Sequence, residues 1–183
     1  MSDQERLNEA IKYAVDCHAG QQRKGTNRPY ILHPLEVMTI LNGVGADANL
    51  LIAGLLHDTI EDAGVTRAEL CDRFGDDVAG LVAAHSEDKS RTWQERKSTA
   101  IEELRHADHR LALLIMADKL SNLRSMKRDY NAVGEKLWER FNAPRERQAW
   151  YYNSIIDVLK PMEDDAHARG CYEEIKDICR QLF

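Results

Sequence analysis

The stretch Leu55-Leu56-His57-Asp58-Thr59-Ile60-Glu61-Asp62 decides how this sequence is interpreted. It continues a run of apolar residues that predicts a buried helix. The run ends in one imidazole and three carboxylates, which are costly to bury unless they are paired or bind a metal. Residues four apart lie on one face of a helix, so His57 would lie beside Glu61, and Asp58 beside Asp62. We therefore expect these four side chains to point into one small volume.

Two further polar residues interrupt apolar segments. His33 lies within Pro29-Tyr30-Ile31-Leu32-His33-Pro34, and Asp118 lies in an apolar helix with no histidine or arginine on its core face. With His57 and Asp58 they form the pattern H…HD…D. Two imidazoles and two carboxylates suit a divalent ion such as Mn²⁺ or Fe²⁺, with water completing an octahedron. The absence of thiolate from this set argues against a structural zinc site.

Length and composition favour one globular domain. The chain has 183 residues, of which 43% are hydrophobic and 31% are charged, and it contains only four prolines. A chain of this length can bury one core, and this composition is typical of a helical protein. No apolar stretch approaches the roughly 20 residues of a membrane span. The polar N-terminus has no signal-peptide core, so we expect a cytoplasmic protein with no membrane partner.

Charge and cysteine content narrow the function further. The net charge of −6 argues against nucleic acid as the main partner, because phosphate neutralisation requires a basic face. A small anionic ligand remains compatible with this charge. The four cysteines show no CxxC spacing, so we expect free thiols.

Periodicity and capping patterns predict an all-α, single-domain bundle. Thr66 and Thr92 each begin a capping-box pattern, and Asp108 can cap the helix that carries Asp118. No stretch alternates convincingly, so no substantial sheet is expected. The predicted helices span residues 4–19, 34–44, 48–60, 66–74, 78–85, 92–106, 109–128, 134–141, 145–160 and 163–182.

A polar loop at residues 21–30 precedes His33. It carries three cations, Arg23, Lys24 and Arg28. The loop can be read as an ordinary solvated connection or as a clamp for an anion or nucleotide beside His33. The local pattern does not decide between the two.

Five ordered segments give the chain a family resemblance. It resembles HD-domain phosphohydrolases of the RelA/SpoT hydrolase class, most closely the small stand-alone alarmone hydrolases. The similarity is close over residues 4–130, with the motif core at 18–130, and looser over the C-terminal helices at 134–183, which would complete a single HD domain spanning 1–183. The matching segments are Ala19-Gly20-Gln21-Gln22-Arg23-Lys24, Pro29 to Pro34, Leu55 to Asp62, Glu87-Asp88-Lys89 and Ala117-Asp118-Lys119-Leu120-Ser121-Asn122-Leu123-Arg124.

The resemblance implies a metal site and a pair of catalytic carboxylates. Glu61 and Asp62 would orient and activate the attacking water. One Mn²⁺ per chain is implied, with Fe²⁺ or another divalent ion as an alternative. The implied ligands are His33, His57, Asp58 and Asp118.

The resemblance also implies a nucleotide substrate. Arg23 and Lys24 would flank a guanine base, and Asn122 would contact the nucleotide. The reaction of that class removes the 3′-pyrophosphate of ppGpp or pppGpp. Other substrates, such as pppApp-type alarmones or the 2′-phosphate of NADPH, and a non-catalytic nucleotide-sensing role are the alternatives. The oligomeric state stays open, a homo-oligomer included.

The chain departs from the family pattern at three places. Gly25 replaces a serine often found in the loop, and His85-Ser86 stands where Val-Thr is usual. The aromatic segments Trp138 to Asn142 and Trp150 to Tyr152 also differ from the typical C-terminal region. We expect these differences to bear on substrate choice and not on the metal.

Overall fold

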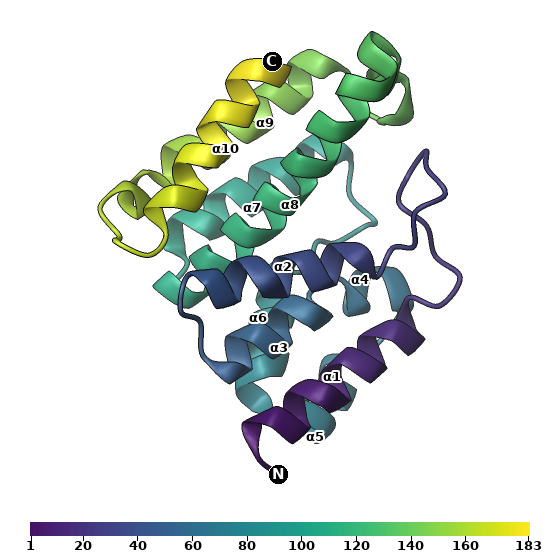
Figure 1. Ribbon diagram of the computed structural model, residues 1–183, viewed down its shortest axis with the longest axis vertical. Helices are drawn as coiled ribbons and strands as arrows, with labels where there is room; N and C mark the ends of the chain where they lie inside the picture. Colours follow the sequence, from purple (N-terminus) through teal and green to yellow (C-terminus); the bar gives the residue numbers. More distant parts are fainter. The chain divides into compact units, whose positions relative to one another are not determined.

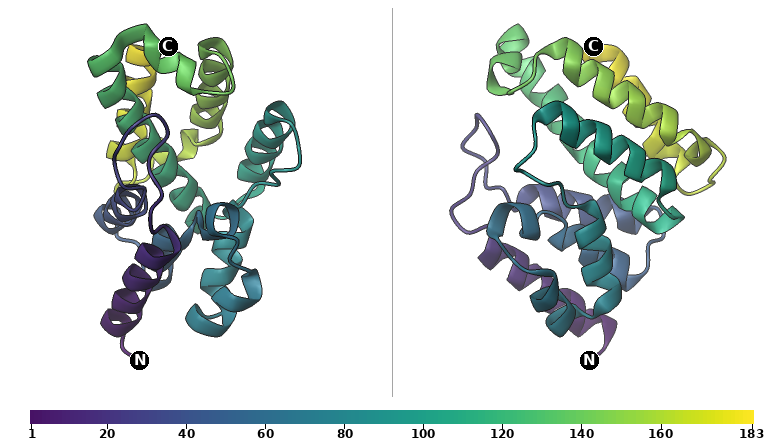
Figure 2. Two further views of the ribbon diagram at one scale, coloured as in Figure 1. Left: turned by 90° about the vertical axis from the view of Figure 1, so that its right-hand side faces the viewer. Right: turned by 180° about the vertical axis from the view of Figure 1, so that it is seen from behind.

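The computed structural model describes all 183 residues, and every regular element in it is a helix. The expected all-α fold is confirmed (Figures 1 and 2). The chain divides into two compact units, Met1–Glu87 and Asp88–Phe183. The helices of the first unit are α1 (Asp3–Cys17), α2 (Leu32–Gly43), α3 (Ala48–Leu56), α4 (Thr59–Ala63), α5 (Arg67–Phe74) and α6 (Asp76–His85).

Helix α3 forms the centre of the first unit. It contacts α1, α2 and α6 (Figure 1). Its sequence, ANLLIAGLL, is apolar on nearly all sides, which is typical of a helix surrounded by others. Asp47 caps its start, since the backbone N–H of Leu50 donates to Asp47 Oδ1 at 2.9 Å. The predicted burial of this run is therefore confirmed.

A glycine allows α2 and α3 to approach closely. A Cβ atom on Gly54 would lie 2.6 Å from Cδ1 of Leu41 in α2, well inside van der Waals contact. The close approach matters because the first turn of α2 carries His33 and the end of α3 leads into His57.

The prediction of one helix over residues 48–60 is wrong. Helix α3 ends at Leu56, His57 and Asp58 form a turn, and α4 begins at Thr59. Two side chains form hydrogen bonds with backbone carbonyls at this break. His57 Nδ1 lies 2.8 Å from the carbonyl oxygen of Gly54, and Thr59 Oγ1 donates to the carbonyl of Leu56 at 2.7 Å. Such local side-chain bonds compete with the helical ladder.

The second unit contains the remaining helices. Helix α8 packs against α10, and α9 packs against α7 and α10. The predicted caps are confirmed: Thr92 and Glu95 form a reciprocal capping box, and Asp108 Oδ1 accepts the N–H of Leu111 at 2.8 Å. The elements are α7 (Trp93–His106), α8 (His109–Val133), the 3₁₀ helix η1 (Gly134–Arg140), α9 (Arg145–Val158), the 3₁₀ helix η2 (Lys160–Glu163) and α10 (Arg169–Leu182).

Two predicted boundaries in this unit differ from the structure by more than two residues. Helix α8 continues to Val133, beyond the predicted end at residue 128. Helix α10 begins at Arg169 and not at residue 163, because Asp165 Oδ1 accepts the backbone N–H groups of His167 and Ala168 in the preceding turn. None of the helices is long and apolar enough to span a membrane.

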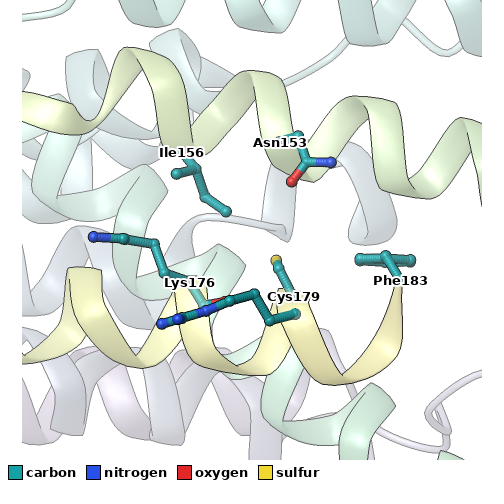
Figure 3. A pocket seen from close by; sticks show the side chains of 6 residues that line it. Asn153, Ile156, Lys176, Cys179 and Phe183 are labelled. Atoms are coloured by element: carbon teal, nitrogen blue, oxygen red, sulfur yellow. The ribbon is translucent and has the colours of Figure 1, made fainter.

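A cavity of about 450 Å³ lies between α9 and α10 (Figure 3). Its apolar wall comes from Ile156 and Phe183, and burial raises the pKa of the Cys179 thiol there to about 12. The cavity lining shares no residue with the metal and substrate site that the sequence predicts.

Candidate metal centre

Three donor atoms from α2 and the α3–α4 junction converge in the first unit. His33 Nε2 lies 3.2 Å from His57 Nε2 and 3.6 Å from Asp58 Oδ2. His57 Nε2 lies 3.0 Å from the same Asp58 oxygen. Both imidazoles are buried, with exposed fractions of 4% and 0%. These three residues form a group whose ligand atoms lie close enough to hold a metal ion.

The hydrogen bond of His57 Nδ1 determines the tautomer of the ring, and therefore whether Nε2 can bind a metal. The carbonyl of Gly54 can only accept, so His57 Nδ1 donates, and Nε2 of the neutral ring then carries a lone pair. That lone pair faces Asp58 Oδ2. A metal ion placed between His57 Nε2, Asp58 Oδ2 and His33 Nε2 would satisfy all three atoms. A backbone carbonyl behind a ligating histidine is a usual partner.

Tyr30 links the donor cluster to Asp62. Its hydroxyl donates to Asp58 Oδ2 at 2.6 Å and lies 3.1 Å from Asp62 Oδ2. Burial and the charge of Asp58 raise the pKa of Tyr30, so the phenol keeps its hydrogen. Tyr30 is not among the site residues that the sequence predicts. Its position three residues before His33, inside a matching segment, was the available signal.

Glu61 lies beside the donor cluster. Its Oε1 accepts the backbone N–H of Glu87 at 2.5 Å. Burial raises the pKa of Glu61, and the charge of Asp58 acts in the same direction, against the hydrogen bond from Glu87. The ring of His85 also lies close, edge-on to the ring of His57 with centroids 5.0 Å apart. Asp62, by contrast, is exposed and open to water.

The two ends of the cationic loop at residues 21–30 are joined by backbone contacts before the chain enters α2. An isolated β-bridge joins Gln22 to Pro29, and Arg23 N donates to the carbonyl of Arg28 at 2.9 Å. The guanidinium of Arg23 lies 5.5 Å from the centroid of the Tyr30 ring. Lys24 is exposed. The loop therefore places Arg23 against Tyr30, while the roles of Arg23 and Lys24 toward a base stay predictions.

Asp118 and Asn122 belong to the second unit, on α8. Asp118 is 3% exposed. Lys119 Nζ lies 2.6 Å from its Oδ2, and Asn122 Nδ2 donates to its Oδ1 at 2.5 Å. No histidine or arginine was expected there, and the cation beside Asp118 is Lys119, which is adjacent in sequence. The assignments of Asp118 to a metal and of Asn122 to a nucleotide stay predictions.

Comparisons with known proteins agree on one family. A family model described as an HD domain matches residues 10–146. The chain is 39% identical over 180 residues to guanosine-3′,5′-bis(diphosphate) 3′-pyrophosphohydrolase MESH1 of Danio rerio, covering 97% of this chain and 92% of that protein. It is 41% identical over 130 residues to the protein of the same name from Xenopus tropicalis, covering 69% and 73%.

Solved structures give the same result. A protein from Listeria monocytogenes EGD-e, lmo0812, superposes with a TM-score of 0.73 and 37% identity, covering 81% of this chain and 99% of that one. A structure described as a metazoan ortholog of SpoT that hydrolyses ppGpp superposes with a TM-score of 0.78 and 31% identity, covering 96% and 94%.

Proposed function

Because this chain belongs to the HD-domain family, we propose that it is a metal-dependent hydrolase that removes the 3′-pyrophosphate of ppGpp, releasing GDP and pyrophosphate. The relatives that carry this activity in their names match most of the chain. The observation that carries the proposal is the convergence of His33 Nε2, His57 Nε2 and Asp58 Oδ2. We propose that residues 1–183 act as one HD hydrolase domain.

The proposed cofactor is Mn²⁺. Mixed imidazole and carboxylate donors suit Mn²⁺ or Fe²⁺ better than a thiolate-preferring ion. Asp118 is the predicted fourth ligand. When bound, such an ion acts as a Lewis acid that makes water more acidic and neutralises phosphate charge.

The chain's own residues divide the remaining work. Asp62 is exposed and carries a carboxylate that can accept the proton of an attacking water, and Glu61 can orient that water from its more buried position. Arg23 presents a planar cation that can stack on a purine, and Lys24 offers a point charge to phosphate. Asn122 has an amide suited to a sugar or base edge.

A turnover screen tests the proposal directly. Chelator-treated protein is supplied with Mn²⁺, Fe²⁺, Mg²⁺ or Zn²⁺ and incubated with ppGpp, pppGpp, pppApp, NADPH and deoxynucleotides. We expect the fastest turnover with ppGpp and Mn²⁺, with GDP and pyrophosphate as products. Fastest turnover of another substrate would transfer the assignment to that substrate.

An exposed carboxylate supplies the matched control for the screen. The Asp62→Ala variant should bind the metal and the nucleotide, with kcat lowered by about 10²–10⁴-fold. Wild-type protein that binds ppGpp and metal tightly but releases no product would make this chain a nucleotide sensor and would refute the proposed hydrolase.

A further inference from the structure

Tyr30 occupies a position between two carboxylates with different proposed tasks. Its hydroxyl oxygen lies 2.6 Å from Asp58 Oδ2, a candidate metal ligand, and 3.1 Å from Asp62 Oδ2, a candidate catalytic group. The Asp58 oxygen is the same atom that faces His57 Nε2 at 3.0 Å. A single phenol therefore touches both the metal-binding atom and the carboxylate proposed to act on water.

A tyrosine hydroxyl has one hydrogen and cannot fully satisfy two carboxylates at once. The shorter distance places that hydrogen on Asp58 in this structure. A cation bound at Asp58 Oδ2 withdraws electron density from that oxygen and weakens its hold on the phenol hydrogen. The hydrogen can then turn toward Asp62 with little movement, because Asp62 Oδ2 is already within hydrogen-bonding distance.

The surroundings hold Tyr30 and Asp62 in place for such an exchange. The backbone N–H of Tyr30 donates to the carbonyl of Gln21 at 2.9 Å, and the side-chain amide of Gln21 donates to the backbone carbonyl of Asp62 at 2.9 Å. The Tyr30 ring lies 4.9 Å from the ring of His18, whose Nδ1 is 2.8 Å from Gln21 Oε1. Asp62 is thus tied to this segment through both its backbone and its side chain.

We propose that Tyr30 is a positioning residue that couples metal binding at Asp58 to the orientation of Asp62. The proposal rests on the proposed function, since it assumes a metal at Asp58 and a catalytic Asp62. In the absence of metal the hydroxyl hydrogen rests on Asp58, and with metal bound it orients Asp62 toward the substrate.

The Tyr30→Phe variant tests this coupling. It removes one oxygen and keeps the ring that packs on His18. Mn²⁺ binding to the chelator-treated full chain is measured by calorimetry, and ppGpp turnover is measured in parallel. We expect the Kd for Mn²⁺ to fall by about threefold to tenfold, because the variant lacks the hydrogen bond to Asp58 that metal binding has to displace. We expect kcat to fall by about 10-fold or more while KM changes by less than about twofold.

Tyr13→Phe is the matched control. Tyr13 also donates its hydroxyl to a carboxylate, Glu69 Oε1 at 2.7 Å, in the same unit. This variant should leave Mn²⁺ affinity, kcat and KM unchanged. An unchanged or a weaker Mn²⁺ affinity in Tyr30→Phe would overturn the proposal, and so would a rise in KM alone, which would place the hydroxyl on the substrate.

A double variant separates the effect of Tyr30 on metal binding at Asp58 from its effect on Asp62. In the Asp62→Asn background, Tyr30→Phe should cause no further loss of kcat but should still strengthen Mn²⁺ binding. An additive loss of kcat would contradict action through Asp62. Wild-type protein that binds Mn²⁺ but does not hydrolyse ppGpp would refute the proposed function, while the Mn²⁺ affinity of Tyr30→Phe would still test the hold on Asp58.

A crystal structure of the Mn²⁺-loaded wild-type protein decides the matter even if Tyr30→Phe does not fold. A Tyr30 hydroxyl closer to Asp62 than to Asp58 supports the exchange. A hydroxyl beyond hydrogen-bonding distance of Asp62 overturns it.

Discussion

The α3–α4 junction and the middle of α8 both place a carboxylate against an apolar core, but they solve the problem of burial differently. At the junction, the imidazoles of His57 and His33 and the hydroxyl of Tyr30 face Asp58 Oδ2. On α8, Asp118 lies against Lys119 and Asn122 of its own helix. The donors around Asp58 suit a bound cation, whereas Lys119 provides the positive charge beside Asp118.

This difference shows which sequence signal carries information. A carboxylate inside an apolar helix is costly to bury, but a neighbouring lysine can offset that cost. Imidazoles that converge on the same carboxylate are a different case, because imidazole nitrogens and a carboxylate oxygen can bind the same metal ion. The donor set, and not burial alone, indicates a metal.

The largest expected effect is at the junction. His57→Ala removes one of three converging donors, so we expect metal affinity to fall by more than about 100-fold, beyond the loss typical of an outer group. Turnover should fall by at least about 10³-fold, because the Lewis acid is lost. Metal content by elemental analysis and initial rates measure both. His109→Ala, which removes an exposed histidine paired with Asp165, is the control and should change neither.

The next effect separates chemistry from metal binding within the same unit. Asp62→Ala should keep the metal and lower kcat by about 10²–10⁴-fold, the usual contribution of a general acid–base group. Glu61→Ala should behave in the same way. Single-turnover rates at saturating Mn²⁺ measure the loss. If either variant lost its metal, that carboxylate would be a ligand and the division of roles would be wrong.

The third effect tests whether α8 resembles the junction after all. Asp118→Asn keeps the shape and the hydrogen bond to Asn122 but removes the charge, so a ligand role predicts a loss of Mn²⁺ affinity of about 10- to 100-fold. Asp129→Asn is the control on the same helix, since Asp129 pairs with Arg140 at 2.9 Å. Equal metal affinity in both variants would leave Asp118 as the structural partner of Lys119.

The sequence predicted the helices better than their ends. Caps such as Thr92 with Glu95 could be read directly, because the bonds are local. The break after Leu56 could not, since it depends on where the His57 and Thr59 side chains find carbonyls. The start of α10 depends in the same way on the side chain of Asp165.

The site was predicted by its charged residues and missed where neutral groups matter. The convergence of His33, His57 and Asp58 followed from the pattern of polar residues in apolar runs. Tyr30 escaped notice because a tyrosine in a loop carries no such signal. Its place between two carboxylates follows only from the distances of its hydroxyl to Asp58 and Asp62.

A smaller effect concerns the loop that precedes α2. Arg23→Ala should raise KM for ppGpp by about 10-fold, in line with the loss of one cation–π contact to a base, with a smaller change in kcat. Turnover of p-nitrophenyl phosphate should be little affected, because it has no base to stack. Arg28→Ala is the control in the same loop. Equal losses on both substrates would place Arg23 on phosphate.

The smallest effect lies in the second unit, at a carboxylate held by ordinary donors. The N–H of Ala168, the ring of His109 and the N–H of His167 lower the pKa of Asp165 from its usual value of 3.8. A lowered pKa in the folded state means that the charged form stabilises the protein above pH 3.8, and that this stability is lost as the pH falls through the lower folded value.

Asp165→Ala should therefore reduce Tm by about 2–4 °C at neutral pH, equivalent to ~1 kcal/mol for a lost cap. The difference in Tm between Asp165→Ala and wild type should shrink below pH 3.8. Added Mn²⁺ should leave this difference unchanged, whereas His57→Ala affects metal binding itself. Thermal melts with and without Mn²⁺ measure it, and a difference that vanished on adding Mn²⁺ would show that this turn, too, depends on the metal.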